Sequence, residues 1–142
     1  MTKQWSLFLL LLCNSCLLIG QIPDKLEKYL TKLEKAVANH SYNAVLKLTD
    51  TDYRKEQHDD FLQGNTKQFV DELLSGYSVE TNIFVNHTLN DISSITRSTI
   101  HAESENSVYV AYLLLSDYNP PINCTLHFVK RTKKWGIVGA VG

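Results

Sequence analysis

The spacing of hydrophobic positions changes from a helical period to a strand period near the middle of the chain. Leucine and valine side chains recur every three or four residues between Leu26 and Val37. This spacing predicts an amphipathic helix that begins at Asp24 and ends near Asn39, with lysines on its solvent-exposed face.

Two shorter helices are predicted to follow the first. Ser41 is a suitable N-cap for the second helix, because a serine hydroxyl can accept a bond from a free backbone N–H. Gly64 marks the entry to the third helix, which Gly76 stops. The polar stretch Asp50 to Asp60 between them is predicted to be a solvated loop.

From Tyr77 onward the period is two, which predicts five strands. The first is expected from Tyr77 to Asn86, and the others at 92–103, 107–115, 122–130 and 134–141. Short polar turns separate them, so antiparallel pairing is the economical arrangement. Helices followed by strands indicate the α+β class.

A leucine-rich segment near the start predicts a secretory signal peptide. Lys3 supplies the positive flank, and Gly20 offers a small residue for cleavage. The apolar run of about 13 residues is shorter than the roughly 20 that a membrane-spanning helix needs. We therefore expect a signal peptide at 1–20 and a single secreted domain at 21–142, extracellular and without a membrane anchor.

The charge of the mature chain does not favour a nucleic-acid-binding protein. Removal of Lys3 leaves 13 of the 14 Lys and Arg against 15 Asp and Glu, so the mature chain carries about −2. The basic cluster 130–134 is expected to be a hairpin tip, and no nucleic-acid partner is predicted.

Cys124 is the one cysteine after residue 20. It is either a buried thiol or a bridge to a second chain, and its alternation with Leu126 and Phe128 favours burial.

Three N-glycosylation sequons agree with the secretory interpretation. They begin at Asn39, Asn86 and Asn123. Asn123 is the weakest of the three, because a cysteine occupies the middle position and the asparagine opens a strand. The predicted product is a secreted glycoprotein.

Several segments between residues 24 and 142 resemble one known family. They are the stretch 38–48, Gly64 with the following helix around Phe69, the segment 126–128 and Trp135. Together with the order of elements, they resemble the nuclear transport factor 2-like, or ketosteroid isomerase-like, cone fold. A signal peptide before this domain is similar to small secreted proteins of roundworms. The resemblance implies a cone-shaped α+β domain, with three N-terminal helices packed on a curved, mostly antiparallel sheet around a blind apolar pocket, and frequent dimerisation across the outer sheet face.

The isomerase branch of that family works with one tyrosine and two aspartates. The corresponding positions here hold Leu33, Gln57 and Leu126, which cannot perform its proton transfers. The resemblance therefore implies no catalytic residue. No cofactor or metal is predicted either, because the chain lacks the spacing of a calcium loop or a zinc site.

The alternative is a divergent enzyme of isomerase or dehydratase type that uses the acidic and histidine segment Asp52–Asp60. Its base would be His58 or one of Asp52, Glu56 and Asp59. This alternative requires at least two of these groups to converge on one cavity.

The preferred interpretation is a secreted, non-catalytic binding or interaction module, with two expected uses. A small apolar molecule would be held in the cone by Leu33, Val37, Phe69, Tyr112, Leu126, Phe128 and Trp135. A second copy would pair through Tyr109, Leu113 and Leu115 on the opposite face of the sheet.

Overall fold

The computed structural model describes Ile22 and residues 24–141. The predicted signal peptide, residues 1–20, lies outside the described residues, so it stays a prediction. Among the described residues, no helix combines the length and the apolar character that crossing a membrane requires.

The helices precede the strands along the chain. Their bounds are α2 (Asp24–Ala38), α3 (Tyr42–Lys47), α4 (Thr51–Arg54), the π-helical segment η1 (Lys55–Phe61) and α5 (Thr66–Leu73). Ser41 caps α3 as predicted, since its side chain accepts from the backbone N–H of Ala44. Asn65 does the same for α5 by accepting from Gln68.

The predicted loop between Asp50 and Asp60 is wrong, because α4 and η1 occupy it. The Asp50 carboxylate accepts from the backbone N–H groups of Asp52 and Tyr53, both at 3.1 Å, and so begins a helix. Within η1, the His58 ring is buried and packs edge-on against Phe69, with ring centroids 5.5 Å apart. The segment has too few apolar side chains to show a helical period in the sequence.

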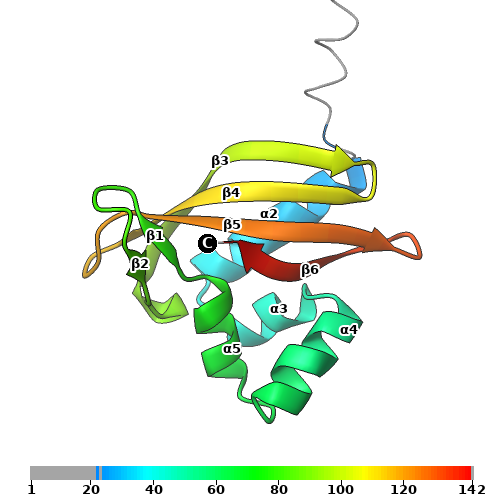
Figure 1. Ribbon diagram of the computed structural model, residues 1–142, viewed down its shortest axis with the longest axis horizontal. Helices are drawn as coiled ribbons and strands as arrows, with labels where there is room; N and C mark the ends of the chain where they lie inside the picture. The colour runs from blue at the N-terminus through cyan, green and yellow to red at the C-terminus, as the bar shows by residue number, and fades with distance from the viewer. Residues whose placement is uncertain (1–21, 23, 142) are drawn as a thin grey trace, which may run out of the picture.

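The strands form one six-stranded antiparallel sheet in the order β2-β1-β5-β4-β3, with β6 also paired to β5. Their bounds are β1 (Gly76–Ser78), β2 (Phe84–Val85), β3 (Ile92–Ser104), β4 (Ser107–Ser116), β5 (Ile122–Arg131) and β6 (Lys134–Val141). The predicted bounds of the last four strands are confirmed to within one residue. Figure 1 shows α2 behind the long strands and α3, α4 and α5 below them. Buried side chains of α2, α3 and α5 share one hydrophobic core with those of the sheet. The α+β fold class is therefore confirmed.

The strand predicted from Tyr77 to Asn86 is wrong, since the structure folds this stretch into the β1–β2 hairpin. Asn82 adopts a φ of 54° and donates its backbone N–H to the Ser78 carbonyl at 2.9 Å. The Ser78 hydroxyl also accepts from the backbone of Glu80 and Thr81. Asparagine tolerates the left-handed backbone region, and the apolar alternation continues across the turn without marking it.

Regular β-bulges curve the sheet. β3 has 13 residues against the 10 of β4, and the three extra residues are Ser93, Ser98 and Glu103. The Ser93 hydroxyl donates to the Leu115 carbonyl, and that of Ser98 donates to the Ala111 carbonyl. Each bulge bends its strand and increases its twist, so the arch of β3 in Figure 1 follows from three bulges in succession.

An ion-pair cluster ties edge strand β3 to α2. Arg97 donates from Nη1 to Glu27 at 2.7 Å and binds both carboxylate oxygens of Glu34. The two-pronged pair fixes the guanidinium plane, a geometry that lysine cannot reproduce. The hydrogen bond from Arg97 lowers the pKa of Glu27.

Cys124 is a free, buried cysteine, which confirms the burial predicted from strand alternation. Its thiol lies 3.6 Å from the Leu73 carbonyl. Burial raises the pKa of this thiol to about 12, so the reactive thiolate is scarce at neutral pH.

The Tyr112 hydroxyl is a buried polar group without a hydrogen-bond partner among the described residues. Burying an unpaired hydroxyl costs free energy, so Tyr112→Phe is expected to raise the free energy of unfolding by about 1 kcal/mol. Urea denaturation of both proteins measures this difference. A clear loss of stability would contradict the expectation, because it would reveal a partner for the hydroxyl.

Candidate functional site

The residues predicted to line an apolar pocket all belong to one hydrophobic core. Each is at most 3% exposed: Leu33, Val37, Phe69, Tyr112, Leu126, Phe128 and Trp135. The structure therefore brings all seven together, covered by neighbouring side chains. Only Trp135 also lines one of the two surface cavities described below.

The larger of these cavities is a polar cleft of about 500 Å³ between α5 and the segment before β3. We name it the Asp71 cleft. It is lined by Asn65, Lys67, Gln68, Asp71, Glu72, Ser75, Asn86, His87, Thr88 and Asp91. Of these residues, Asn86 alone is predicted from the sequence as a site residue, for glycosylation.

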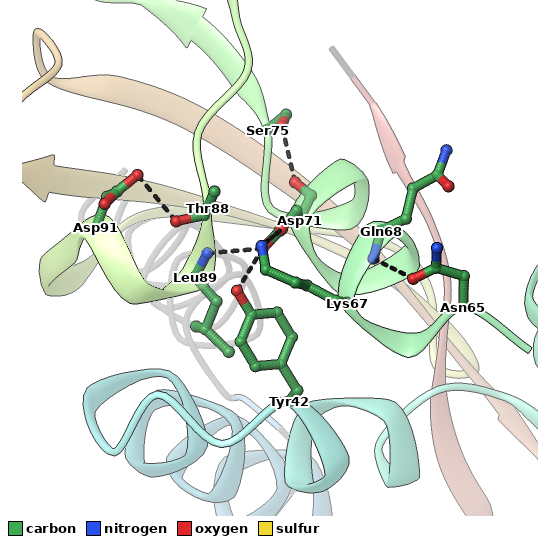
Figure 2. Close-up of polar contacts among 9 residues, drawn as sticks. All are labelled: Tyr42, Asn65, Lys67, Gln68, Asp71, Ser75, Thr88, Leu89 and Asp91. Carbon is green, nitrogen blue, oxygen red and sulfur yellow. Dashed lines mark hydrogen bonds and ion pairs between the residues drawn. The ribbon is translucent and has the colours of Figure 1, made fainter.

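Asp71 connects three separate elements at the cleft. Its Oδ1 accepts from the Tyr42 hydroxyl of α3 at 2.9 Å and from the Leu89 backbone N–H at 2.8 Å. Its Oδ2 accepts from the Lys67 ammonium at 2.8 Å. Figure 2 shows these donors converging on the carboxylate. The Asp71 side chain is 16% exposed, so the network holds a mostly buried charge.

The network also shifts the proton affinity of its members. Burial, followed by the hydrogen bond to Asp71, raises the pKa of Tyr42. The hydrogen bond to Asp71 likewise raises the pKa of Lys67. Both donors therefore keep their protons at neutral pH, where each can donate to Asp71.

Local hydrogen bonds hold the remaining walls in place. Gln68 donates to Glu72 one turn further along α5 at 2.8 Å. On the facing segment, the Thr88 hydroxyl donates to Asp91 at 2.9 Å across the short 3-10 helix η2 (Leu89–Asp91). Figure 2 shows this bond opposite α5. The walls of the cleft are therefore held by the chain's own hydrogen bonds.

The lining charge of the cleft is negative. Lys67 contributes one positive charge, and Asp71, Glu72 and Asp91 contribute three negative charges, so the sum is −2. An excess of carboxylates in a concave site attracts cations and hydrogen-bond donors.

His87 lies in the wall of this cleft and is only 5% exposed. Within the part of the chain that the structure describes, neither ring nitrogen has a hydrogen-bond partner of ordinary geometry. Burial lowers the pKa of His87, and the nearby backbone of Leu74 and the carboxylates of Asp71 and Asp91 oppose this shift only in part. The ring is therefore neutral at pH 7.

This lowered pKa predicts a loss of stability on acidification. The unfolded chain binds a proton at His87 near pH 6.5, whereas the folded protein resists it until a lower pH, so stability falls as the pH drops through that window. His87→Gln is expected to flatten the profile, and His101→Gln, on the exposed part of β3, is expected to preserve it. Thermal unfolding between about pH 7.5 and about pH 5.5 measures this. Identical profiles for all three proteins would contradict it.

The groups of the predicted enzymatic alternative do not converge. Asp52 lines the second cavity, of about 330 Å³, where it pairs with Arg131 at 3.2 Å. Glu56 and Asp59 are exposed. His58 is buried, and its ring nitrogens lie against Asp59 and Thr66. Because neither cavity receives two of the four groups, the geometry does not meet the condition set for this alternative.

The three sequons occupy different settings. Asn39 lies in the turn after α2, and Asn86 lies in the irregular segment after β2; both are exposed. Asn123 is also exposed but sits within β5, between its partners Tyr77 and Leu113. Asn86 is the sequon that borders the Asp71 cleft.

The residues predicted to pair two copies lie on β4, on the sheet face opposite the core. Tyr109 stacks on His127 of β5 with ring centroids 4.2 Å apart. Leu113 is half-buried, and Leu115 is 38% exposed. The structure therefore places all three on the same side of β4.

Comparison with known proteins gives structural likeness alone. No protein-family model matches the chain, and no curated protein matches it. Among solved structures, an NTF-2 like protein of unknown function from Shewanella oneidensis MR-1 is similar at 15% identity, with a TM-score of 0.45 over 82% of this chain and 94% of that one.

Two further solved structures are similar at the same level. A DUF4783 family protein from Bacteroides ovatus is 9% identical, with a TM-score of 0.44 over 84% of this chain and 91% of that one. A SEC-C motif containing protein from Rhodopseudomonas palustris is 13% identical, with a TM-score of 0.44 over 76% of this chain and 70% of that one. At these identities, the function must be argued from the site.

Proposed function

We propose that this chain is a secreted, non-catalytic binding module that holds a small polar molecule in the Asp71 cleft. The observation that carries the proposal is the preformed cleft itself. Its volume of about 500 Å³ falls within the range of roughly 300 to 1,000 Å³ typical of small-molecule sites. Export of the chain is supported by the leucine-rich leader and by the three sequons.

Binding rather than catalysis fits the chemistry of the cleft. Catalysis by a carboxylate base needs a free lone pair aimed at the substrate. On Asp71, Tyr42 and Leu89 both donate to Oδ1 and the Lys67 ammonium donates to Oδ2, so the oxygen left with free acceptor capacity already binds a cation. A carboxylate held in this way contributes recognition and fixed charge.

Native mass spectrometry of the protein purified from its own source tests the proposal. We expect a retained small molecule in the wild-type protein. Gln68→Trp, which places a large side chain in the cleft wall, should lose it, whereas Glu56→Trp on the exposed face of η1 should keep it. Protein without a bound molecule, or equal retention by both variants, would contradict the proposal.

A second candidate function is self-association through the outer face of the sheet. The observation in its favour is the partly exposed set Tyr109, Leu113 and Leu115 on β4. Light scattering after size exclusion should then show a dimer that Leu113→Arg converts to a monomer. A monodisperse wild-type monomer at roughly tens of micromolar would end this candidate, because stable interfaces form well below that concentration.

A further inference from the structure

The Asp71 cleft contains an ammonium site that the chain fills with its own lysine. The Lys67 ammonium lies 2.8 Å from Asp71 Oδ2 and 5.5 Å from the ring centroid of Tyr42. A carboxylate beside an aromatic face is a combination that recognises organic cations, by a charge-assisted hydrogen bond and by a cation–π contact.

Lys67 can be displaced without dismantling the site. Its side chain is 60% exposed, whereas that of Asp71 is 16% exposed. Exposed pairs spaced four residues apart on a helix are weak. If Lys67 leaves, Asp71 Oδ1 keeps its bonds from Tyr42 and Leu89, so the carboxylate stays in position.

A second observation points independently to a ligand with more than one donor. His87 is buried in the cleft wall, and neither of its ring nitrogens has a hydrogen-bond partner of ordinary geometry among the described residues. A neutral imidazole always has one acceptor nitrogen. An unpaired acceptor in a site with a net charge of −2 suits a molecule that carries hydrogen-bond donors and a positive charge.

Building on the proposed function, we propose that the ligand is a small organic cation. Its ammonium group replaces that of Lys67 on Asp71 and Tyr42, and a second donor on the same molecule reaches toward His87. Lys67 is then a built-in competitor that keeps the anionic site neutralised when the ligand is absent. The remaining carboxylates, Glu72 and Asp91, add long-range attraction for the cation.

Isothermal titration with three matched probes tests this class. Tyramine carries the ammonium, tyrosol replaces it with a neutral hydroxyl, and 4-hydroxyphenylacetate replaces it with a carboxylate. The wild-type protein is expected to bind tyramine at least roughly tenfold more tightly than either analogue, because only the ammonium forms a charge-assisted bond to Asp71. Raising the salt concentration should weaken that binding.

Two variants isolate the role of Lys67 and of the surrounding charge. Lys67→Met removes the competitor and should tighten tyramine binding roughly threefold, in keeping with the weakness of an exposed pair. Glu72→Gln should weaken binding by a similar factor, and Glu56→Gln, outside the cleft, should leave it unchanged. Unchanged thermal unfolding of Lys67→Met verifies that the variant folds.

The outcomes separate this inference from the proposed function. Equal binding of tyramine and tyrosol, or weaker tyramine binding in Lys67→Met, would overturn the cation assignment. The cleft would still stand as a site if native mass spectrometry found a neutral or anionic molecule that Gln68→Trp loses. Absence of any retained molecule, together with no binding of any probe, would remove both.

Discussion

Gly76→Ala is expected to destabilise the protein by about 3 kcal/mol, the upper end of the usual cost of overpacking. A Cβ atom at this position of β1 would lie 2.0 Å from the backbone oxygen of Asn123 on β5. Backbone atoms in a paired central strand cannot move aside as a flexible side chain can, so β1 must shift from its partner. Denaturant unfolding of the purified variant measures the loss.

Gly64→Ala is the matched control for this substitution. Nothing lies within 4 Å of a Cβ atom at Gly64, so only its positive φ of 76° opposes the change. We expect a cost of about 1 kcal/mol from that backbone conformation. Equal stability of the Gly76→Ala protein and the wild type would show that β1 does not approach β5 as described.

Phe128→Ala is expected to cost about 3 to 5 kcal/mol, as large-to-small changes in packed cores do. Phe128 is fully buried at the centre of β5 and meets Tyr29 of α2 edge-on, with ring centroids 6.2 Å apart. The substitution removes a ring that joins the sheet to the helix. Thermal and denaturant unfolding together give the loss.

The Phe128 result also distinguishes a packed core from an apolar ligand pocket. A side chain that lines an empty pocket contributes little packing, so its removal would cost far less. A loss below about 1 kcal/mol would therefore contradict the core described here and favour a ligand in the cone. Tyr109→Ala on the outer sheet face is the control, with an expected loss under about 1 kcal/mol.

Much of the fold follows from hydrophobic period and turn chemistry. Buried and less buried side chains alternate along most of β4 and β5. The hairpin between β5 and β6 has positive φ at both Thr132 and Lys133, as a tight two-residue turn requires. The first helix is equally clear in the sequence. Each of these elements is determined by residues close to one another in the chain.

The missed elements depend on contacts that a local pattern does not contain. α4 and η1 have few apolar residues. The buried position in η1 is held by His58, and a histidine counts as polar when hydrophobic periodicity is assessed from the sequence. The β1–β2 turn lies inside an alternating run, where Asn82 is the one local signal for a left-handed backbone. Tertiary packing decides both cases.

The Asp71 cleft could not be predicted from one sequence. Lys67 and Asp71 read as an ordinary surface pair on a helix, four residues apart. The partners that bury Asp71 come from 29 residues before it, at Tyr42, and 18 residues after it, at Leu89. In the sequence, His87 is a single histidine in a turn or strand-edge context, inside the sequon that begins at Asn86. The site exists because the fold joins these distant segments.

An amide-resolved NMR titration of the purified protein with tyramine tests the central claim most directly, because it reports where the probe binds. We predict that the shifting resonances concentrate at residues 65–75 and 86–91, around the Asp71 cleft. Shifts confined to the outer sheet face around Tyr109 and Leu113, or within the core around Phe128, would contradict the assignment of the binding site.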